Sequence, residues 1–513
     1  MAKPTLDKDL KTFTRLQAET RQVGRGLVPI SLAGLFLLLV GLVASTLVGF
    51  GGPWLILVGS AMVGGYMALN IGANDVANNM APAVGSRALT IGVAIAIAAV
   101  FEAAGAIIAG GSVIATVSSG IINPSAMGSP GDFTLAMLAA LFAAALWINL
   151  ATWLGAPVST THSVVGGVLG GGVAMAGFAA ADWSVVARIV ASWVVSPLLG
   201  GLIAAGFLAY IKFRILYLPD KLGEAQRRVP VLVGIMAGAF TTYLIMKGFS
   251  RVMDVPILVA LGLGAVMFVL VLRGVRPFID RQVVGLPQRR SSVAQLFNIP
   301  VICGAALLSF AHGANDVANA IGPLAAIYTT VTEATLVTQA EVPFWVLLIG
   351  ALGIALGLTL FGPKLIRTVG SKITKLDRIR AFCVTLSAAI TVIVASALGL
   401  PVSSTHIAIG ALFGVGFLRE YLEHRRRRGK ALVAGDDEKP EPVNNSTETS
   451  AESDAARLAK TAKQVEKRRR RVLVRRGHVV TIVAAWVITV PASALLAALL
   501  AHALLALDLP GLP

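Results

Sequence analysis

One motif with polar side chains occurs twice in this chain. Residues 72–78 and 313–319 both read Gly-Ala-Asn-Asp-Val-Ala-Asn, and each copy lies within a strongly apolar stretch. Each copy contributes a carboxylate, Asp75 or Asp316, where the surrounding hydropathy predicts hydrocarbon. An ionisable side chain inside a membrane segment is costly, so the default interpretation is a functional site.

A second polar motif is repeated as well. Residues 157–162 read Pro-Val-Ser-Thr-Thr-His, and residues 401–406 read Pro-Val-Ser-Ser-Thr-His. The two motifs recur after 241 and 244 residues, from 72 to 313 and from 157 to 401. The chain therefore contains one long internal duplication.

The first motif has the side chains of a cation site. Its two asparagines are four residues apart and share a helix face, with the aspartate between them. Amide and carboxylate oxygens, with backbone carbonyls freed at a helix interruption, are ligands that hard cations such as sodium prefer. The expected cation-coupling residues are Asp75, Asp316, Asn78 and Asn319, and the two aspartates are the expected sodium ligands if sodium is the coupling ion.

The second motif has the side chains of an oxyanion site. Consecutive hydroxyls and free backbone N–H groups can donate to an oxyanion, and a helix N-terminus favours its charge. The preceding proline fits the start of a helix or hairpin. The expected substrate-binding residues are Ser159, Thr160, Thr161, Ser403, Ser404 and Thr405, together with Asn74 and Asn315.

The charges of these motifs constrain the chemistry. Neither motif contains Lys or Arg, yet each half contributes an aspartate. A dianion about 6 Å from a carboxylate would be repelled by roughly 5–6 kcal/mol at an effective dielectric constant of 20. Several cations or protons must therefore enter with any anion, so an anionic substrate implies cation-coupled symport.

The composition indicates an all-α polytopic membrane protein. Hydrophobic residues make up 56% of the 513 residues and charged residues 13%, whereas a soluble protein would carry roughly twice that charge. The net charge of +17 is distributed in short basic runs between apolar segments. This pattern is typical of cytoplasmic loops facing anionic lipid and argues against a nucleic-acid partner. Cys303 and Cys383 offer neither a disulfide framework nor metal-ligand spacing.

The loop charges predict orientation. The chain contains about 12–13 apolar segments that could span a bilayer, and the basic connectors between them should be cytoplasmic, as should the N-terminus. The connector 331–343 has no Lys or Arg and should lie outside. With thirteen crossings the segment 54–86 then runs inward and 296–330 outward, which is an inverted-topology repeat of the kind common in secondary transporters. A parallel duplication, with one crossing more or fewer between the halves, is the alternative.

The two motif segments are too long for one straight span. We expect broken or re-entrant helices there, with Gly72, Pro82, Gly313 and Pro323 as the breakers. The expected organisation is a cytoplasmic N-terminal segment (1–28), a first membrane repeat (29–211), a linker region with two transmembrane helices (212–295), a second membrane repeat (296–424), a basic, disordered cytoplasmic loop (425–476) and an extra C-terminal transmembrane helix (477–513).

Together, the repeated motifs resemble those of the inorganic phosphate transporter (PiT) family, over residues 54–421. The resemblance implies import of inorganic phosphate across the cell membrane, driven by sodium or protons, by a homodimer with two inverted repeats and no other cofactor. The family's aspartates would be Asp75 and Asp316. Glu102 resembles its intramembrane glutamate and is therefore a further expected cation-coupling residue. The halves differ where Asn79 of the first copy is replaced by Ala320 in the second.

Several alternatives stay open from the sequence. The substrate could be sulfate, another tetrahedral oxyanion or a metal–phosphate complex. The sequence argues against an intramembrane hydrolase, because the chain has no His-Glu-x-x-His or Gly-x-Ser-x-Gly setting. A passive channel would not explain paired inverted motifs. His162 and His406 could relay protons or cap a hairpin. His312 has Ile71 as its counterpart, so we expect no general role for it.

Overall fold

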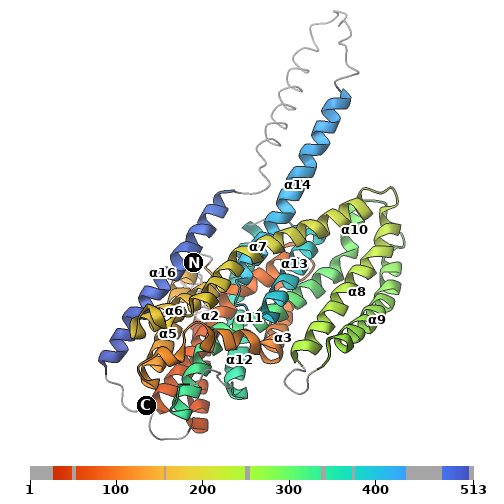
Figure 1. The fold of residues 1–513 in the computed structure, drawn as a ribbon. Coiled ribbons are helices and arrows are strands. Elements are labelled where there is room, and N and C mark those ends of the chain that lie inside the picture. Colours follow the sequence, from red (N-terminus) through yellow and green to blue (C-terminus); the bar gives the residue numbers. More distant parts are fainter. Residues whose placement is uncertain are drawn as a thin grey trace, which may run out of the picture.

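The computed structural model describes residues 27–48, 54–154, 158–248, 255–336, 342–372, 376–434 and 476–507 (Figure 1). Apart from one isolated β-bridge between Ile122 and Ala181, the regular structure of these residues is helical, which confirms the predicted all-α class. Eleven helices of the described ranges are long and apolar enough to cross a membrane. Most of the predicted segments 1–28 and 425–476 lie outside these ranges.

The helices follow the predicted apolar segments closely. The first is Leu27–Val48. The others are α2 (Trp54–Gly85), α3 (Ile91–Ala109), α4 (Gly111–Ala115), α5 (Pro130–Leu154), α6 (Thr160–Ala176), α7 (Trp183–Ile211), α8 (Lys221–Gly248), α9 (Ile257–Val283), α10 (Arg290–Leu296), α11 (Asn298–Glu333), α12 (Phe344–Lys372), α13 (Arg378–Ala397), α14 (Ser404–Ala434) and α16 (Arg476–Ala506). Short π-helices occupy Thr116–Gly120 and Lys212–Leu216, and 3-10 turns occupy Pro124–Ala126 and Phe178–Ala180.

The two motif helices, α2 and α11, are continuous, so the predicted breaks within them are wrong. They have 32 and 36 residues and run through Pro82 and Pro323. The glycines Gly72 and Gly313 do not interrupt these helices, but allow a neighbouring helix to approach closely. A Cβ at Gly72 would overlap the carbonyl of Ile354 in α12, and a Cβ at Gly313 would overlap that of Glu102 in α3. At about 1.5 Å per residue both helices exceed a bilayer core, so they must tilt or protrude.

Two helical hairpins bring the second motif to the first. The chain reverses between α5 and α6, and again between α13 and α14, and at each reversal a buried Val-Ser pair (158–159 and 402–403) enters the next helix. Helices α6, with 17 residues, and α14 are not among the eleven candidate spans. Because the tips lie against α2 and α11 inside the bundle, this arrangement is the one expected of re-entrant hairpins. The sequence prediction counted α5, α6, α13 and α14 as four separate crossings. If each pair is a hairpin that returns to its own side, every connector stays on the side predicted for it.

The C-terminal helix α16 packs against α5 and α6 at the edge of the bundle. Glycines that are 244 residues apart line two similar helix contacts: Gly166 and Gly170 of α6 meet the backbone of α16, and Gly410 and Gly414 of α14 meet that of α7. The partner helices also share a pattern, Ala-Ser-Trp-Val-Val-Ser at 191–196 and Ala-Ala-Trp-Val-Ile-Thr at 484–489. Helix α16 therefore relates to the first hairpin as α7 relates to the second.

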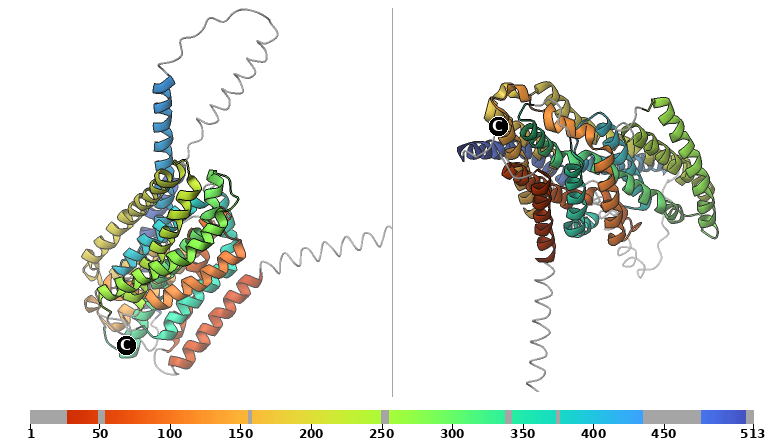
Figure 2. Two further views of the ribbon diagram at one scale, coloured as in Figure 1. Left: turned by 90° about the vertical axis from the view of Figure 1, so that its right-hand side faces the viewer. Right: turned by 90° about the horizontal axis from the view of Figure 1, so that it is seen from below.

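The first helix and the pair α8–α9 lie at the periphery of the bundle. Figure 2 shows Leu27–Val48 along one side and the pair α8–α9 on another. Only 17% of the apolar window of Leu27–Val48 and 11% of that of α9 is buried, against 89% for α11. Outward-facing apolar side chains are expected where a helix meets lipid. The two repeated motifs lie instead in helices whose apolar windows are mostly buried, 67% in α2 and 89% in α11.

Candidate functional site

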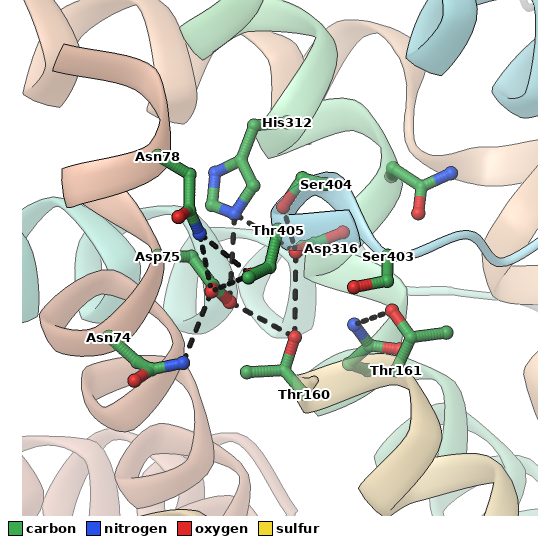
Figure 3. A network of polar contacts seen from close by, with 12 residues as sticks. Asn74, Asp75, Asn78, Thr160, Thr161, His312, Asp316, Ser403, Ser404 and Thr405 are labelled. Atoms are coloured by element: carbon green, nitrogen blue, oxygen red, sulfur yellow. Dashed lines mark hydrogen bonds and ion pairs between the residues drawn. The ribbon is translucent and has the colours of Figure 1, made fainter. Parts of the chain in front are cut away.

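The two repeated motifs meet at one buried centre. Asp75 and Asp316 are each only 1% exposed, although they lie on different helices. The hydroxyl of Thr160, from the tip of the first hairpin, lies 3.1 Å from Asp75 Oδ2 and 3.5 Å from Asp316 Oδ2 (Figure 3). A single hydroxyl therefore joins the carboxylates of the two halves.

The second hairpin contributes hydroxyls to the same centre. Thr405 Oγ1 donates to Asp75 Oδ1 at 3.0 Å, and Ser404 Oγ donates to Asp316 Oδ2 at 3.4 Å. These residues begin α14, as Thr160 begins α6. The N-termini of both hairpin helices, with their positive dipole ends and first-turn N–H groups, are thus directed at the two aspartates.

The last asparagine of each motif binds a hydroxyl of the other half. Asn78 Nδ2 donates to Thr405 Oγ1 at 2.7 Å, and Asn319 Nδ2 donates to Thr161 Oγ1 at 3.2 Å. Thr161 in turn donates to the carbonyl of Val402 at 3.0 Å. The two hairpin tips are therefore tied to each other as well as to the motif helices.

The first asparagine of each motif braces the hairpin of its own half. Asn74 Nδ2 donates to the Val158 carbonyl at 3.3 Å. Asn315 Nδ2 donates to the Leu400 carbonyl and its Oδ1 accepts from the N–H of Val402, both at 3.2 Å. These two predicted substrate-binding residues are placed to position the tips.

Ser159 and Ser403, also predicted to bind substrate, cap the hairpin helices. Ser159 Oγ accepts from the backbone N–H of His162 at 3.2 Å, and Ser403 Oγ accepts from that of His406 at 3.3 Å. The histidine rings meet each other, with centroids 4.6 Å apart. Within the described ranges the buried His162 ring has no hydrogen-bond partner, so no direct hydrogen bond links it to the aspartates, and a role in proton relay stays a prediction.

His312, for which we expected no general role, lies at the centre of the site. Its Nε2 is 2.9 Å from Asp316 Oδ2 and 3.9 Å from Asp75 Oδ2, and its Nδ1 is 3.1 Å from Glu102 Oε2. Glu102 also accepts from Asn79 Nδ2 at 2.9 Å. Glu102 therefore reaches the aspartates through a histidine. The four-residue spacing of His312 and Asp316 was the available sequence signal, because it places both on one helix face.

This histidine–glutamate pair is the asymmetric part of the site. Gly313 packs against Glu102 in the contact of α11 with α3, whereas Gly72 packs against Ile354 in the contact of α2 with α12. Ile71 precedes Gly72 as His312 precedes Gly313. One half thus has an ionisable pair where the other has two isoleucines.

Two buried oxygens of the second Asn-Asp motif lack donors in the part of the chain that the structure describes. Asp316 Oδ1 and Asn319 Oδ1 have no hydrogen-bond partner among the described residues, and they lie three residues apart on one helix. One ligand atom each from Asp75, His312 and Asp316 lies within 4.8 Å of the others. Since buried polar atoms are nearly always satisfied, these oxygens fit a cation.

Comparison with known proteins agrees with this geometry. Residues 71–497 match the model of the phosphate transporter family. The chain belongs to this family. A protein of Helicobacter pylori (strain J99) with the name "Putative phosphate permease" is 46% identical over 97% of this chain and 98% of its own length. A similarly named protein of Pyrococcus abyssi is 39% identical over 72% of this chain and 89% of its own length.

A solved structure described as "The sodium-dependent phosphate transporter" has the same fold. It matches with a TM-score of 0.75 and 33% identity, over 88% of this chain and 100% of its own. The phosphate transporter family consists of transporters and not enzymes, so an intramembrane hydrolase is excluded. The family match, over residues 71–497, includes most of α16 and therefore extends beyond the 54–421 of the motif resemblance.

Proposed function

We propose that this chain imports inorganic phosphate across the cell membrane in symport with sodium. The observation that carries the proposal is the position of Thr160, whose hydroxyl lies within 3.5 Å of both Asp75 and Asp316. The expected oxyanion donor lies within hydrogen-bond distance of both expected cation ligands, so the binding of the anion and the binding of the cation must affect each other. The family match supports phosphate as the substrate.

Sodium is favoured as the coupling ion by the donor set. Asp316 Oδ1 and Asn319 Oδ1 are oxygen ligands without protein donors in the described chain, and hard cations prefer such oxygens. The relative described as sodium-dependent supports the same choice. Asp75 and Asp316 would hold the cations, and Asn78 would position the hydroxyl of Thr405.

Coupling would arise from competition for the hydroxyl protons. Thr160, Ser404 and Thr405 each have one hydroxyl proton, and in this structure each lies within reach of an aspartate. A cation that binds the aspartates takes over their lone pairs and releases the hydroxyls to donate to phosphate. It also removes the repulsion between two carboxylates and a dianion. Sodium would therefore bind first and raise the affinity for phosphate.

The two halves would be inverted repeats that share this site. The paired glycine contacts support the repeat, with α16 completing the second half as α7 completes the first. Alternating exposure of a site at the interface of such repeats is the usual mechanism of secondary transport. A homodimer remains a prediction from the family resemblance.

Uptake of labelled phosphate into proteoliposomes tests the proposal. An inward sodium gradient should drive accumulation, and an inward proton gradient without sodium should not. Sulfate in excess should leave phosphate uptake unchanged. A chelator of divalent metal ions should also leave it unchanged, because the proposed substrate is free phosphate and not a metal–phosphate complex. Accumulation driven by protons alone, or inhibition by sulfate as strong as by unlabelled phosphate, would refute the assignment of ion or substrate.

A further inference from the structure

The tip of the second hairpin is held through its backbone carbonyls. Helix α13 ends at Ala397 and α14 begins at Ser404, and each carbonyl of residues 399–402 accepts a hydrogen bond from a side chain of a different helix. The pairs of acceptor and donor are Gly399 with Thr116, Leu400 with Asn315, Pro401 with Trp193, and Val402 with Thr161. Since backbone polar groups inside proteins are nearly always satisfied, the shape of this tip depends on side chains from distant parts of the chain.

Thr116 makes the shortest of these four contacts. Its hydroxyl donates to the carbonyl of Gly399 at 2.7 Å. Gly399 has a φ of +68°, in the left-handed region that favours glycine. A Cβ at this position would lie 3.2 Å from the carbonyl oxygen of Ser112 and 3.3 Å from Oγ1 of Thr116. The turn that ends α13 is therefore fitted closely against the segment 112–116.

The segment that carries Thr116 is itself anchored to other helices. A Cβ at Gly322 of α11 would lie only 2.7 Å from the side chain of Val117. On α8, Lys247 Nζ donates to Ser112 Oγ at 3.1 Å. The position of the Thr116 hydroxyl is thus set by helices outside the second hairpin, and one of them carries the second Asn-Asp motif.

Thr116 also belongs to a further repeated pattern. Residues 110–119 read Gly-Gly-Ser-Val-Ile-Ala-Thr-Val-Ser-Ser, and residues 362–371 read Gly-Pro-Lys-Leu-Ile-Arg-Thr-Val-Gly-Ser. The first glycines of both copies pack alike: a Cβ at Gly110 would overlap the Val317 side chain, and a Cβ at Gly362 would overlap that of Val76. At this point the first copy leaves α3 and turns towards the hairpin tip, whereas the second copy continues within α12.

We propose that Thr116 is a positioning residue of the transport site, which holds the tip of the second hairpin so that Ser404 and Thr405 reach the aspartates. This inference rests on the proposed function. The hydroxyls of Ser404 and Thr405 lie 3.4 and 3.0 Å from aspartate oxygens, directly after the tip. Thr116 donates to backbone carbonyls, so it acts through the hairpin. A tip released from Thr116 would displace the N-terminus of α14 and both of these hydroxyls with it.

Phosphate uptake into proteoliposomes and hydrogen exchange in nanodiscs test the proposal on the full chain. Thr116→Val removes the hydroxyl and keeps the side-chain shape, and Thr116→Ser keeps the hydroxyl. Thr116→Ala makes the same comparison if valine prevents insertion. Ser119→Ala is the matched control, because Ser119 lies in the same π-helix and its hydroxyl donates to the carbonyl of Ala115, one turn earlier, at 3.4 Å.

Thr116→Val should raise the phosphate KM roughly two- to tenfold, which corresponds to the loss of one neutral hydrogen bond. Thr116→Ser and Ser119→Ala should keep the KM of the wild type. The backbone amides of residues 399–403 should exchange several times faster in Thr116→Val than in the other three proteins. Hydrogen exchange needs no phosphate, so this measurement does not depend on the identity of the substrate.

Double variants separate positioning from a general loss of stability. Thr116→Val should add little to the KM of Thr405→Val, on the second hairpin, and its full effect to that of Thr160→Val, on the first. Equal additions in both backgrounds, or a lower melting temperature of Thr116→Val with an unchanged KM, would overturn the proposal. If the wild type takes up no phosphate, the proposed function fails, and equal hydrogen exchange in Thr116→Val and Ser119→Ala is then the result that overturns the inference.

Discussion

Asn78 in the first motif donates to Thr405 of the second hairpin at 2.7 Å, and Asn319 in the second motif donates to Thr161 of the first hairpin at 3.2 Å. The two pairs are equivalent under the internal duplication. Each half therefore positions the hydroxyls of the other, and neither half contains a complete site. A movement that separates the hairpins from the opposite motif helix would break both pairs at once.

A double-mutant cycle tests this exchange. Asn78→Ala and Thr405→Val should each raise the phosphate KM, and together they should raise it by less than the product of the single effects. The expected coupling is about 1 kcal/mol, or roughly fivefold in KM. The control pair is Asn78→Ala with Thr161→Val, whose effects should multiply. Coupling of equal size in both pairs would contradict the pairing seen here.

The aspartates should be required for coupling and not for folding. We expect Asp75→Asn and Asp316→Asn each to abolish concentrative phosphate uptake in cells while the protein remains inserted in normal amounts. Asparagine keeps the shape and a hydrogen-bonding group, but it removes the counter-charge of the cation, and a buried carboxylate is itself costly. Full gradient-driven uptake by either variant would show that its carboxylate does not couple transport.

The pair His312–Glu102 should behave as a unit. Replacing His312 by Ile leaves Glu102 buried without its partner, and losing one member of a buried ion pair costs about 3–5 kcal/mol. His312→Ile combined with Glu102→Ile copies the isoleucines of the other half at 71 and 354. The double variant should therefore have a higher melting temperature than His312→Ile. If it melts lower, the histidine does not stabilise the glutamate.

Thiol labelling tests the inverted topology. Single cysteines at Val337 and Val284 should react from opposite sides of the membrane when Cys303 and Cys383 have been replaced. Val284 is 81% exposed in the connector before α10, and 337 lies in the acidic connector outside the described residues. An impermeant reagent applied to intact cells should modify 337 and spare 284. Labelling of both positions, or of neither, would show that α11 does not cross the membrane between them, and would contradict the inverted topology.

The sequence predicted that the two repeated motifs form one site, but not which helix contacts position their side chains. Two identical polar motifs in apolar segments indicated a shared site, because buried carboxylates are too costly to place at random. The continuity of α2 through Gly72 could not be predicted, since the reason is the approach of α12, far along the chain. The pairing of His312 with Glu102 likewise depends on the contact of α11 with α3. Local patterns identify the residues, and distant packing determines their partners.

The affinity for phosphate as a function of sodium tests the central claim most directly. If sodium releases the hydroxyls of Thr160, Ser404 and Thr405 from the aspartates, the phosphate Kd of the purified protein should fall steeply when sodium replaces choline at constant ionic strength. A released charge-assisted hydrogen bond is worth about 1.5–3 kcal/mol, so the fall should be at least about tenfold. Asp316→Asn should show a much smaller dependence on sodium. A phosphate Kd that is the same with and without sodium in the wild type would contradict the account.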